Sequence, residues 1–292
     1  MGSVQVQEAN YVILEKQQLN PQVKQIIVYA PDIAAKAQAG QFVILKTHKN
    51  SERVPLTLAA WEKEIGTITI IFQEVGYSTI ELGALGVGEK IENLAGPLGK
   101  PSEVKNYGKV AMVCGGVGTA ASYPIAKALK EAGNKVTTIM GARNKDLLIL
   151  EAEMRSVSDA FYITTDDGSK GQKGFVSDVL KNLIANGGEF NVVYAVGPPI
   201  MMMVVSQVTQ PFGIKTIVSL NPIMVDGMGM CGACRVSVGG KTKFACVDGP
   251  EFDAHQVNFK ELMQRLKSFS NEEKLTIQVN EKLGETCVCH SK

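Results

Sequence analysis

Short runs of alternating apolar and polar residues fill about the first 100 positions of the chain, and turn residues separate these runs. Alternation with a period of two is typical of half-buried antiparallel strands. Strands are expected at residues 23–29, 41–46, 55–60, 66–73 and 89–94. Because they are short and closely spaced, they favour a small β-barrel, interrupted by one helix at about 77–85.

After a linker at about residues 99–108, buried-type strands alternate with helical patterns. Strands are expected at 109–114, 135–141, 161–165, 192–196 and 216–220, and helices at 119–132, 145–157, 175–185 and 200–209. This alternation implies right-handed crossovers and a parallel sheet covered on both faces. A further helix is expected at 258–269, before a polar tail. The pattern therefore predicts a β-barrel domain over 1–103, an α/β nucleotide-binding domain over 104–222 and a small C-terminal module over 223–292.

Composition narrows the class of protein. The 292 residues carry mixed charges and a net charge of +1, which gives no sign of binding to nucleic acid or an anionic membrane surface. No run of about 18 apolar residues occurs and the first residues do not resemble a secretory signal, so no membrane span or export is expected. Six cysteines do not make a disulfide framework in a chain of this length, which favours a reducing cytoplasm.

A loop near the C-terminal end carries cysteines at iron–sulfur spacing. Asp226, Cys231, Cys234 and Cys246 are separated by four, two and eleven residues. Plant-type [2Fe–2S] sites read C-x4-C-x2-C before a distant fourth cysteine, so aspartate here occupies the first ligand position. Structural zinc usually takes two paired cysteine knuckles, and this loop has one, which favours iron. Asp226 is expected to be a ligand, the alternative being a bystander with water or a partner's group completing the site.

Three glycines punctuate this loop. Gly227, Gly229 and Gly232 are expected to take positive φ and to turn backbone amides toward the cluster. A second sulfur-rich fragment, Cys287-x-Cys289-His290, lies in the polar tail without another ligand pair, so no metal site is assigned to it.

One motif in the barrel has the chemistry for binding a flavin. It reads Arg53-x-Pro55-Leu56-Thr57. An arginine entering a strand can pair with a diphosphate, and a hydroxyl four residues later can hydrogen-bond a flavin ring. An Arg-Pro pair in a strand is often only structural, so the motif depends on its context.

That context is a glycine turn farther along the barrel. Gly76, Ser78 and Thr79 open the helix expected at about 77–85. The free amides and the dipole of a helix N-terminus attract phosphate, so this turn is a candidate for the second half of a diphosphate site.

Two loops at the carboxyl edge of the predicted parallel sheet are candidates for a dinucleotide. Their residues are Gly115, Gly116, Gly118 and Thr119 after the first strand, and Gly197 and Pro198 after a later one. Residues without side chains let a pyrophosphate approach the backbone at a helix N-terminus. The first loop does not match the G-x-G-x-x-G fingerprint, and helix–strand packing alone is the alternative explanation.

Two charged residues follow the next strands. Arg143 lies where an adenosine ribose would be placed, and a basic residue there can favour a 2′-phosphate or pair with a helix. Asp167 either contacts the ribose or ends a turn. The spacing leaves the choice between NAD(H) and NADP(H) open.

In chain order these motifs resemble one family. They are R-x-P-L-T, the Gly-Tyr-Ser-Thr turn, GPLG, CGGVGTA, GARNK, TDDGSKGQKG, AVGPP and the cysteine loop, and they cover about residues 5–250. The set is similar to the ferredoxin–NADP reductase-like flavoproteins, in the branch with the electron-transfer subunit of dihydroorotate dehydrogenase. That subunit has cysteine where this chain has Asp226. The aspartate resembles the small subunits of electron-bifurcating NADH-dependent ferredoxin:NADP oxidoreductases, in which one aspartate and three cysteines are expected to hold the cluster.

The resemblance implies FAD in the barrel, with Arg53 and Thr57 on the flavin side and residues 76–79 at the diphosphate. It implies NAD(H) over residues 115–119, with the Gly197-Pro198 pair near the nicotinamide. No catalytic acid or base is assigned, because flavin and nicotinamide supply the reactivity of hydride transfer.

The resemblance also implies a larger partner, itself carrying flavin and iron–sulfur clusters, that binds NADP(H) and reduces ferredoxin. The chain is then expected to be one half of a heterodimer. It would exchange a hydride between NAD(H) and FAD and pass single electrons to the partner through the [2Fe–2S] cluster. The alternatives are an electron-transfer subunit of dihydroorotate dehydrogenase or of an NAD(P)-linked hydrogenase, and a redox sensor without turnover.

Overall fold

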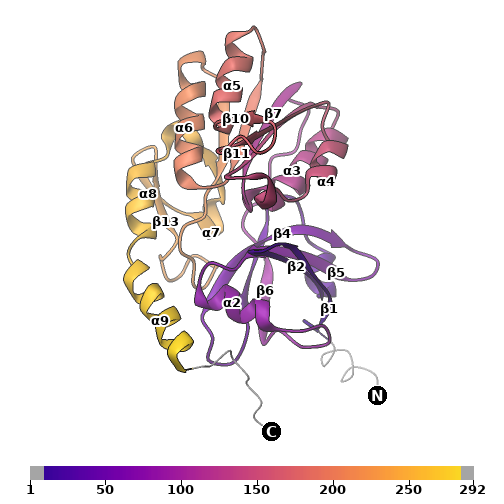
Figure 1. Ribbon diagram of the computed structural model, residues 1–292, viewed down its shortest axis with the longest axis vertical. Helices are drawn as coiled ribbons and strands as arrows, with labels where there is room; N and C mark the ends of the chain where they lie inside the picture. Colours follow the sequence, from indigo (N-terminus) through magenta and orange to yellow (C-terminus); the bar gives the residue numbers. More distant parts are fainter. Residues whose placement is uncertain (1–9, 284–292) are drawn as a thin grey trace.

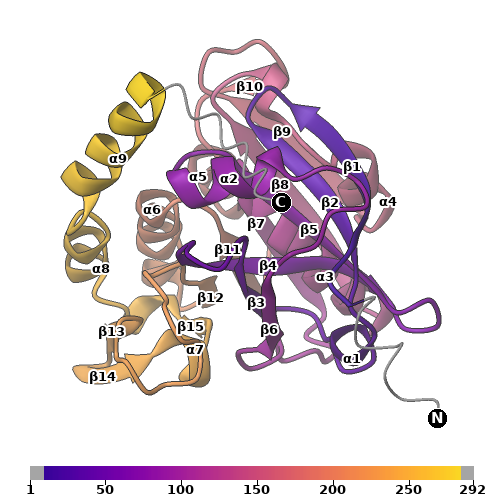
Figure 2. The same ribbon diagram turned by 90° about the horizontal axis from the view of Figure 1, so that it is seen from below.

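The computed structural model describes residues 10–283, and its two large sheets lie one above the other (Figure 1). The strands of the N-terminal part, in indigo and violet, form the lower half, and the α/β part lies above them. The C-terminal segment runs down one side of both, where α9 (Ser270–Leu283) contacts α2 (Tyr77–Ala84) (Figures 1 and 2). Cys287, Cys289 and His290 lie outside the described residues.

Six antiparallel strands form the lower sheet, in the order β1-β2-β5-β4-β3-β6. They are β1 Ile13–Asn20, β2 Val23–Tyr29, β3 Phe42–Lys46, β4 Arg53–Glu62, β5 Thr67–Gln73 and β6 Asn93–Leu98. One apolar cluster takes a side chain from every strand: Ile13, Ile26, Leu45, Leu58, Ile68 and Leu94. The short helices α1 (Pro31–Ala34) and α2 pack on the same core. The predicted small β-barrel is therefore confirmed.

The last barrel strand differs from the prediction. β6 begins four residues later than expected, and Phe42 and Ile44 of β3 pair with Leu98 and Ala95 within it. The Gly96-Pro97 dipeptide thus lies inside a strand, although glycine and proline together usually indicate a turn. A Cβ on Gly96 would come 2.7 Å from Cγ1 of Val43, so glycine permits this close approach of the two strands.

The upper sheet has seven strands, in the order β10-β9-β8-β7-β11-β12-β15. They are β7 Lys109–Gly115, β8 Lys135–Ala142, β9 Ala160–Thr165, β10 Gln172–Lys173, β11 Val192–Val196, β12 Lys215–Ser219 and β15 Glu251–Asp253. All neighbours are parallel except β15, which pairs antiparallel with β12. The predicted parallel sheet is confirmed, and the C-terminal segment supplies its edge strand.

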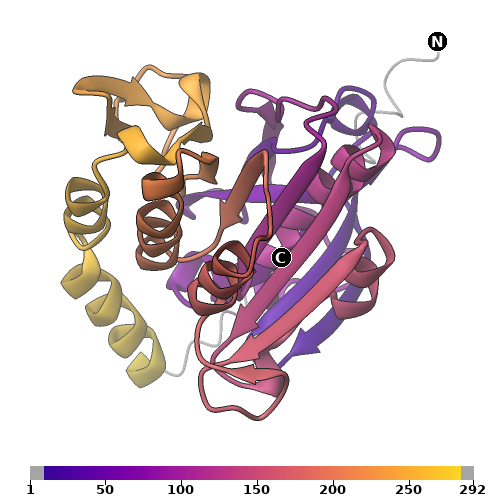
Figure 3. The ribbon, with the colours of Figure 1, turned by 90° about the horizontal axis from the view of Figure 1, so that it is seen from above.

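Helices cover both faces of this sheet (Figure 3). They are α3 Gly118–Glu131, α4 Glu151–Ser156, α5 Val176–Ala185 and α6 Pro199–Thr209, the last continued by a 3-10 turn at Gln210–Phe212. Alternate residues of β7 point to opposite faces of this sheet. Met112 packs in one cluster with Ile125 of α3, and Val113 packs in another with Leu180 of α5. A strand buried on both faces reads as a continuous apolar run, which is why the sequence predicted it.

The C-terminal segment begins with a long loop and the hairpin β13 Arg235–Val238 and β14 Lys241–Phe244. Then follow α7 Ala245–Asp248, β15, a 3-10 turn at Ala254–Gln256, α8 Phe259–Leu266 and α9. Helix α8 turns Phe259 and Leu262 into the core of the upper domain, against α6.

Two helical predictions were wrong in detail. The helix expected at 145–157 is a 3-10 turn at Lys145–Leu147 followed by the short α4, because Leu150 takes a left-handed φ of 56°. Helix α9 occupies part of the expected polar tail. Among the helices that the structure describes, none combines the length and apolar character needed to cross a membrane.

Candidate functional site

The cysteine loop brings two of its thiols together. Sγ of Cys234 lies 3.1 Å from Sγ of Cys246, and both side chains are buried. Burial, and then the neighbouring Cys234, raise the pKa of the Cys246 thiol to about 12. A bound metal ion deprotonates such a thiol outright, so a buried, closely spaced thiol pair is suited to hold iron.

The Asp226 carboxylate lies at the other end of the same loop and accepts hydrogen bonds from two of its backbone amides. Its Oδ1 accepts a hydrogen bond from the Met228 amide at 2.9 Å, and its Oδ2 accepts one from the Cys231 amide at 2.8 Å. The Met228 amide, followed by the Cys231 amide and thiol, holds the pKa of Asp226 below its usual range. The carboxylate therefore lies beside Cys231 while it also shapes the turn.

The four predicted ligands form two pairs, Cys234 with Cys246 and Asp226 with Cys231. Within residues 10–283, no three His, Cys, Asp or Glu side chains are close enough to hold one metal ion together. A [2Fe–2S] cluster needs two protein ligands on each of two irons, so two adjacent pairs fit it better than a single zinc ion. The donor set is compatible with the predicted cluster, and ligation by each residue stays a prediction.

The predicted positive φ of the loop glycines is confirmed, at 76° for Gly227, 81° for Gly229 and 68° for Gly232. Gly227 also marks a close approach. A Cβ there would come 2.6 Å from Cδ1 of Ile44 and 2.7 Å from Cδ1 of Leu98. The cysteine loop thus lies directly on barrel strands β3 and β6.

The same contact joins the thiols to the flavin-side motif. Phe42 and Ile44 of β3 pack in one buried cluster with Cys234 and Cys246. In the barrel, Phe42 is the register partner of Thr57. Residues of the predicted flavin and cluster sites are therefore neighbours through a single strand.

The remaining residues of the barrel motif lie along β4. Arg53, at the start of the strand, is exposed, while Pro55, Leu56 and Thr57 are half-buried. Arg53 pairs in register with Lys46 of β3. The exposed guanidinium and the Thr57 hydroxyl are thus carried on one strand, as the predicted flavin contacts require.

The glycine turn before α2 is held by Thr79. Its hydroxyl accepts from the amides of Val75 and Gly76 at 3.1 and 3.2 Å and donates to the Gly76 carbonyl at 2.9 Å. The space beside Gly76 is open, since a Cβ there would meet nothing within 4 Å. Thr79 therefore shapes the turn, and a phosphate contact by Gly76, Ser78 or Thr79 stays a prediction.

Glycines bring the two nucleotide loops together at the carboxyl edge of the upper sheet. A Cβ on Gly115 would come 2.6 Å from Sδ of Met201, and one on Gly118 would come 2.8 Å from Cα of Gly197. Gly116 has a φ of 56° and open space beside it. Thr119 is buried behind this loop and Pro198 is exposed before α6. The edge has bare backbone where a pyrophosphate is predicted.

Arg143 and Asp167 follow the neighbouring strands β8 and β9 and lie close together, since the Asp167 amide donates to the Arg143 carbonyl at 3.2 Å. The Asp167 carboxylate accepts from the Ser169 amide at 2.9 Å, which makes it a turn residue. The Arg143 side chain is exposed. Neither position distinguishes NAD(H) from NADP(H).

Phe175 is a residue of this edge that the motifs missed. It directly precedes α5 and is 61% exposed. The next residue, Val176, would contact a Cβ on Gly141 at the end of β8, so Phe175 lies at the same carboxyl edge as Arg143. An exposed aromatic ring there could stack on a base. The signal in the sequence was an aromatic residue between a glycine-rich stretch and a helix.

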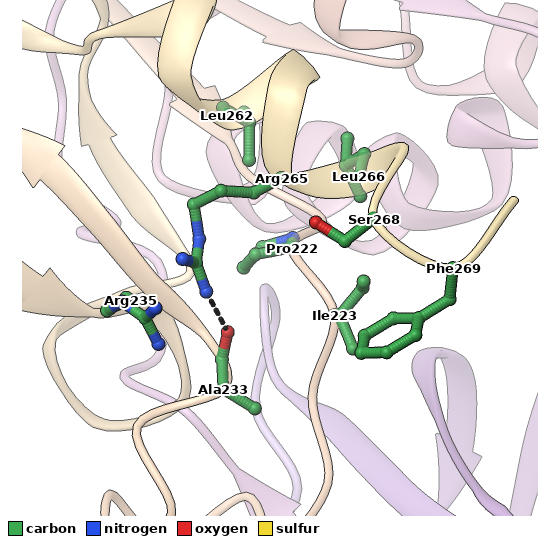
Figure 4. Close-up of a pocket in the computed structure, with 9 residues that line it drawn as sticks. All are labelled: Pro222, Ile223, Ala233, Arg235, Leu262, Arg265, Leu266, Ser268 and Phe269. Carbon is green, nitrogen blue, oxygen red and sulfur yellow. Dashed lines mark hydrogen bonds between the residues drawn. The ribbon is translucent and has the colours of Figure 1, made fainter.

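A cleft of about 250 Å³ lies between the cysteine loop and α8 (Figure 4). Its lining includes the apolar residues Ile223, Leu262, Leu266 and Phe269 and two arginines, Arg235 and Arg265. Nη2 of Arg265 donates to the carbonyl of Ala233 at 3.1 Å, between Cys231 and Cys234 in sequence. The cleft thus borders the predicted cluster site.

Two family models match the chain, one over the cysteine loop and one over the nucleotide loops. The iron-sulfur cluster binding domain of dihydroorotate dehydrogenase B matches residues 221–258, and the oxidoreductase NAD-binding domain matches residues 112–207. A protein of Thermotoga maritima named dihydroorotate dehydrogenase B (NAD(+)), electron transfer subunit homolog, is 47% identical over 266 residues, with 91% of this chain and 94% of that protein covered. This chain belongs to the dihydroorotate dehydrogenase B electron-transfer subunit family.

Other similar proteins agree with membership of this electron-transfer subunit family. The electron transfer subunit of Streptococcus mutans is 32% identical, with 85% of this chain and 97% of that one covered. A solved structure of the NADH-dependent reduced ferredoxin–NADP oxidoreductase is 45% identical with a TM-score of 0.88, covering 95% of this chain and 99% of the other. A flavohem-like FAD/NAD binding domain from Vibrio cholerae, 19% identical with a TM-score of 0.59 over 72% of this chain and 98% of its own, shares the fold. The predicted family and fold are confirmed, and the predicted FAD, iron–sulfur cluster and NAD(H) fit these matches.

Proposed function

We propose that this chain is the smaller subunit of a heterodimeric flavoprotein oxidoreductase. It exchanges a hydride between NAD(H) and FAD and passes single electrons through a [2Fe–2S] cluster to a larger flavin- and iron–sulfur-containing partner. Relatives named as electron transfer subunits support the existence of that partner. The four free cysteines among the described residues suit a reducing cytoplasm.

The contact between the cysteine loop and β3 carries this proposal. Phe42 and Ile44 pack against Cys234 and Cys246, and Phe42 is the register partner of Thr57. A protein that only sensed its cofactors would not need the flavin and cluster sites to be neighbours through β3. Close placement of a two-electron and a one-electron group is what an electron-transfer subunit requires.

FAD, when bound, supplies a ring that takes up two electrons and releases them singly, and the cluster supplies a one-electron carrier. Arg53 and Thr57 would hold the flavin side, with Pro55 and Leu56 shaping β4. Residues 76–79 would orient the diphosphate at the start of α2, where the helix dipole favours anions. Asp226 and the three loop cysteines would hold the cluster.

The nucleotide would bind across the carboxyl edge of the upper sheet. The bare backbone at Gly115, Gly116 and Gly118 lets a pyrophosphate approach the N-terminus of α3. Thr119 supports that loop from its buried side, and the Gly197-Pro198 pair borders the nicotinamide. Arg143 and Asp167 would border the adenosine. We retain the division into a flavin domain (1–103), a nucleotide domain (104–222) and a cluster module (223–292) as part of this proposal.

Two observations favour one type of complex. The structure of the NADH-dependent reduced ferredoxin–NADP oxidoreductase covers 95% of this chain at 45% identity. Asp226 at the first ligand position also departs from a four-cysteine site. We therefore infer an NADH-dependent ferredoxin:NADP oxidoreductase that uses electron bifurcation. The Thermotoga maritima homologue supports a second candidate, the electron-transfer subunit of a dihydroorotate dehydrogenase.

Purification of the native complex tests both candidates. The chain should copurify with a larger flavoprotein, contain one FAD and two irons of its own, and reduce an artificial dye with NADH. A partner that oxidises dihydroorotate would select the second candidate. A pure chain with no flavin and no iron, or one that fails to oxidise NADH, would overturn the proposal.

A further inference from the structure

The backbone between Cys231 and Cys234 is held from outside by two arginines. Nη1 of Arg235 donates to the Gly232 carbonyl at 3.1 Å. Nη2 of Arg265 donates to the Ala233 carbonyl, also at 3.1 Å, and Figure 4 shows this second bond. These two carbonyls belong to the two successive peptides in the middle of the knuckle. Each guanidinium therefore controls one peptide plane.

The orientation of these peptides decides where their amides point. Both are trans, and in a trans peptide the carbonyl and the following N–H point in opposite directions. In the first peptide both polar groups have a partner. The Ala233 amide donates to Sγ of Cys231 at 3.5 Å, and the Gly232 carbonyl accepts from Arg235. In the second peptide, the hydrogen bond from Arg265 orients the Ala233 carbonyl toward α8, so the Cys234 amide points away from that helix.

Arg265 differs from Arg235 in coming from a distant element. Arg235 is exposed and acts within its own loop, whereas Arg265 is half-buried and belongs to α8, 32 residues from Ala233. Leu262, one helical turn before Arg265, is buried in the core of the upper domain. Asn258 caps the start of the helix by accepting from the Glu261 amide at 3.1 Å. A rigidly docked helix thus presents the guanidinium to the knuckle.

We propose that Arg265, with Arg235, is a positioning residue that sets the reduction potential of the predicted cluster. This inference rests on the proposed function, because it requires the cluster. Hydrogen bonds to ligand sulfurs and nearby charge are the main means by which a protein tunes such a potential. Reduction adds a negative charge, so a cation beside the knuckle favours the reduced state. Loss of Arg265 should therefore make the cluster harder to reduce.

The test uses the full chain, reconstituted with FAD, iron and sulfide, in a redox titration followed by electron paramagnetic resonance. Arg265→Gln keeps a hydrogen-bond donor and removes the charge, and Arg265→Leu removes both. The expected order of midpoint potentials is wild type highest, then glutamine, then leucine, with a changed spectrum for the leucine variant. Arg155→Gln is the matched control, because Arg155 is exposed on α4, on the opposite side of the molecule from α8 (Figure 1).

Iron content and circular dichroism accompany each titration. A folded Arg265→Leu chain that retains its iron and shows the potential and spectrum of the wild type would overturn the inference. If that variant fails to fold, Arg265→Gln and Arg235→Gln decide by the same criterion, and unchanged potentials in both would also overturn it. A wild-type chain without any cluster signal would instead overturn the proposed function.

Discussion

Gly118 and Gly197 lie backbone against backbone at the carboxyl edge of the parallel sheet. A Cβ on Gly118 would come 2.6 Å from the carbonyl oxygen of Val196 and 2.8 Å from Cα of Gly197. Real Cβ atoms do not make contacts this short, so only glycine lets the loop after β7 approach the loop after β11. The two predicted halves of the nucleotide site are thereby fixed relative to each other.

Replacing Gly118 by alanine should separate these loops. We expect KM for NADH to rise by roughly tenfold or more, since a displacement of about 1 Å near a reacting centre can cost that much. Flavin and iron content should stay at wild-type levels, because both sites lie elsewhere. Steady-state NADH:dye assays and cofactor analysis check this. Gly86→Ala is the control, as its Cβ would meet only Oε2 of Glu89, at an ordinary 3.4 Å; equal KM values for the two variants would contradict the prediction.

Phe175→Ala should weaken nucleotide binding without destabilising the protein. The ring is 61% exposed at the carboxyl edge, so it contributes little to the core. Stacking on a base is worth roughly 1–3 kcal/mol, so Kd for NAD⁺ should rise about 5- to 150-fold. Calorimetric titration of the flavin-loaded chain with NAD⁺ measures it, because NAD⁺ does not reduce the flavin. Phe212→Ala removes a similarly exposed ring, 58% exposed, from the 3-10 turn after α6, and its Kd should match the wild type.

The parallel strands could be predicted because they are continuous apolar runs, as Val110 to Cys114 show. Helix α9 could not, because its face carries no continuous apolar stripe and Leu275 remains 61% exposed. The position of β6 was missed because a glycine and a proline in sequence indicate a turn, whereas pairing with β3 overrides that preference.

The cysteine spacing predicted the ligand loop because four ligands must converge within a short segment. It held no information on which distant residues surround that loop. Phe42 and Ile44 lie in the barrel, and Arg265 lies on a later helix, yet all three contact the loop or its cysteines. Such contacts depend on how the domains pack, and spacing along the chain does not encode them.

Asp226→Cys should retain the cluster and lower its midpoint potential. A hard carboxylate is exchanged for a soft thiolate, which moves the site toward the low values of plant-type ferredoxins. Asp226→Ala should lose iron as well as the hydrogen bonds from Met228 and Cys231. Redox titration and iron analysis check both variants.

The control for Asp226 is Asp253→Ala, which removes a similar turn bond, from the His255 amide at 3.1 Å, away from the cysteines. It should keep both iron and potential. An Asp226→Cys chain with a full cluster and an unchanged potential would contradict direct ligation by the aspartate.

Glu251 should make the stability of the protein depend on pH. Burial raises the pKa of this carboxyl from its ordinary value of 4.5 to about 7, while a hydrogen bond from Ser102 opposes that rise. Because the folded state holds the proton more tightly than the unfolded state, this group's contribution is complete below pH 4.5 and is lost as the pH rises to about 7. Ser102 follows the barrel and Glu251 begins β15, so the effect arises where the two domains meet.

Glu251→Gln removes the ionisable group but keeps an acceptor for Ser102. Its free energy of unfolding should exceed that of the wild type above pH 7, by at most about 3 kcal/mol, and the difference should fall toward pH 5. Urea unfolding at several pH values measures this. Glu189→Gln, in an exposed pair with Lys109, provides the control and should give parallel curves. If the Glu251→Gln curve also ran parallel to the wild type, Glu251 would titrate normally and the junction would not bury its charge.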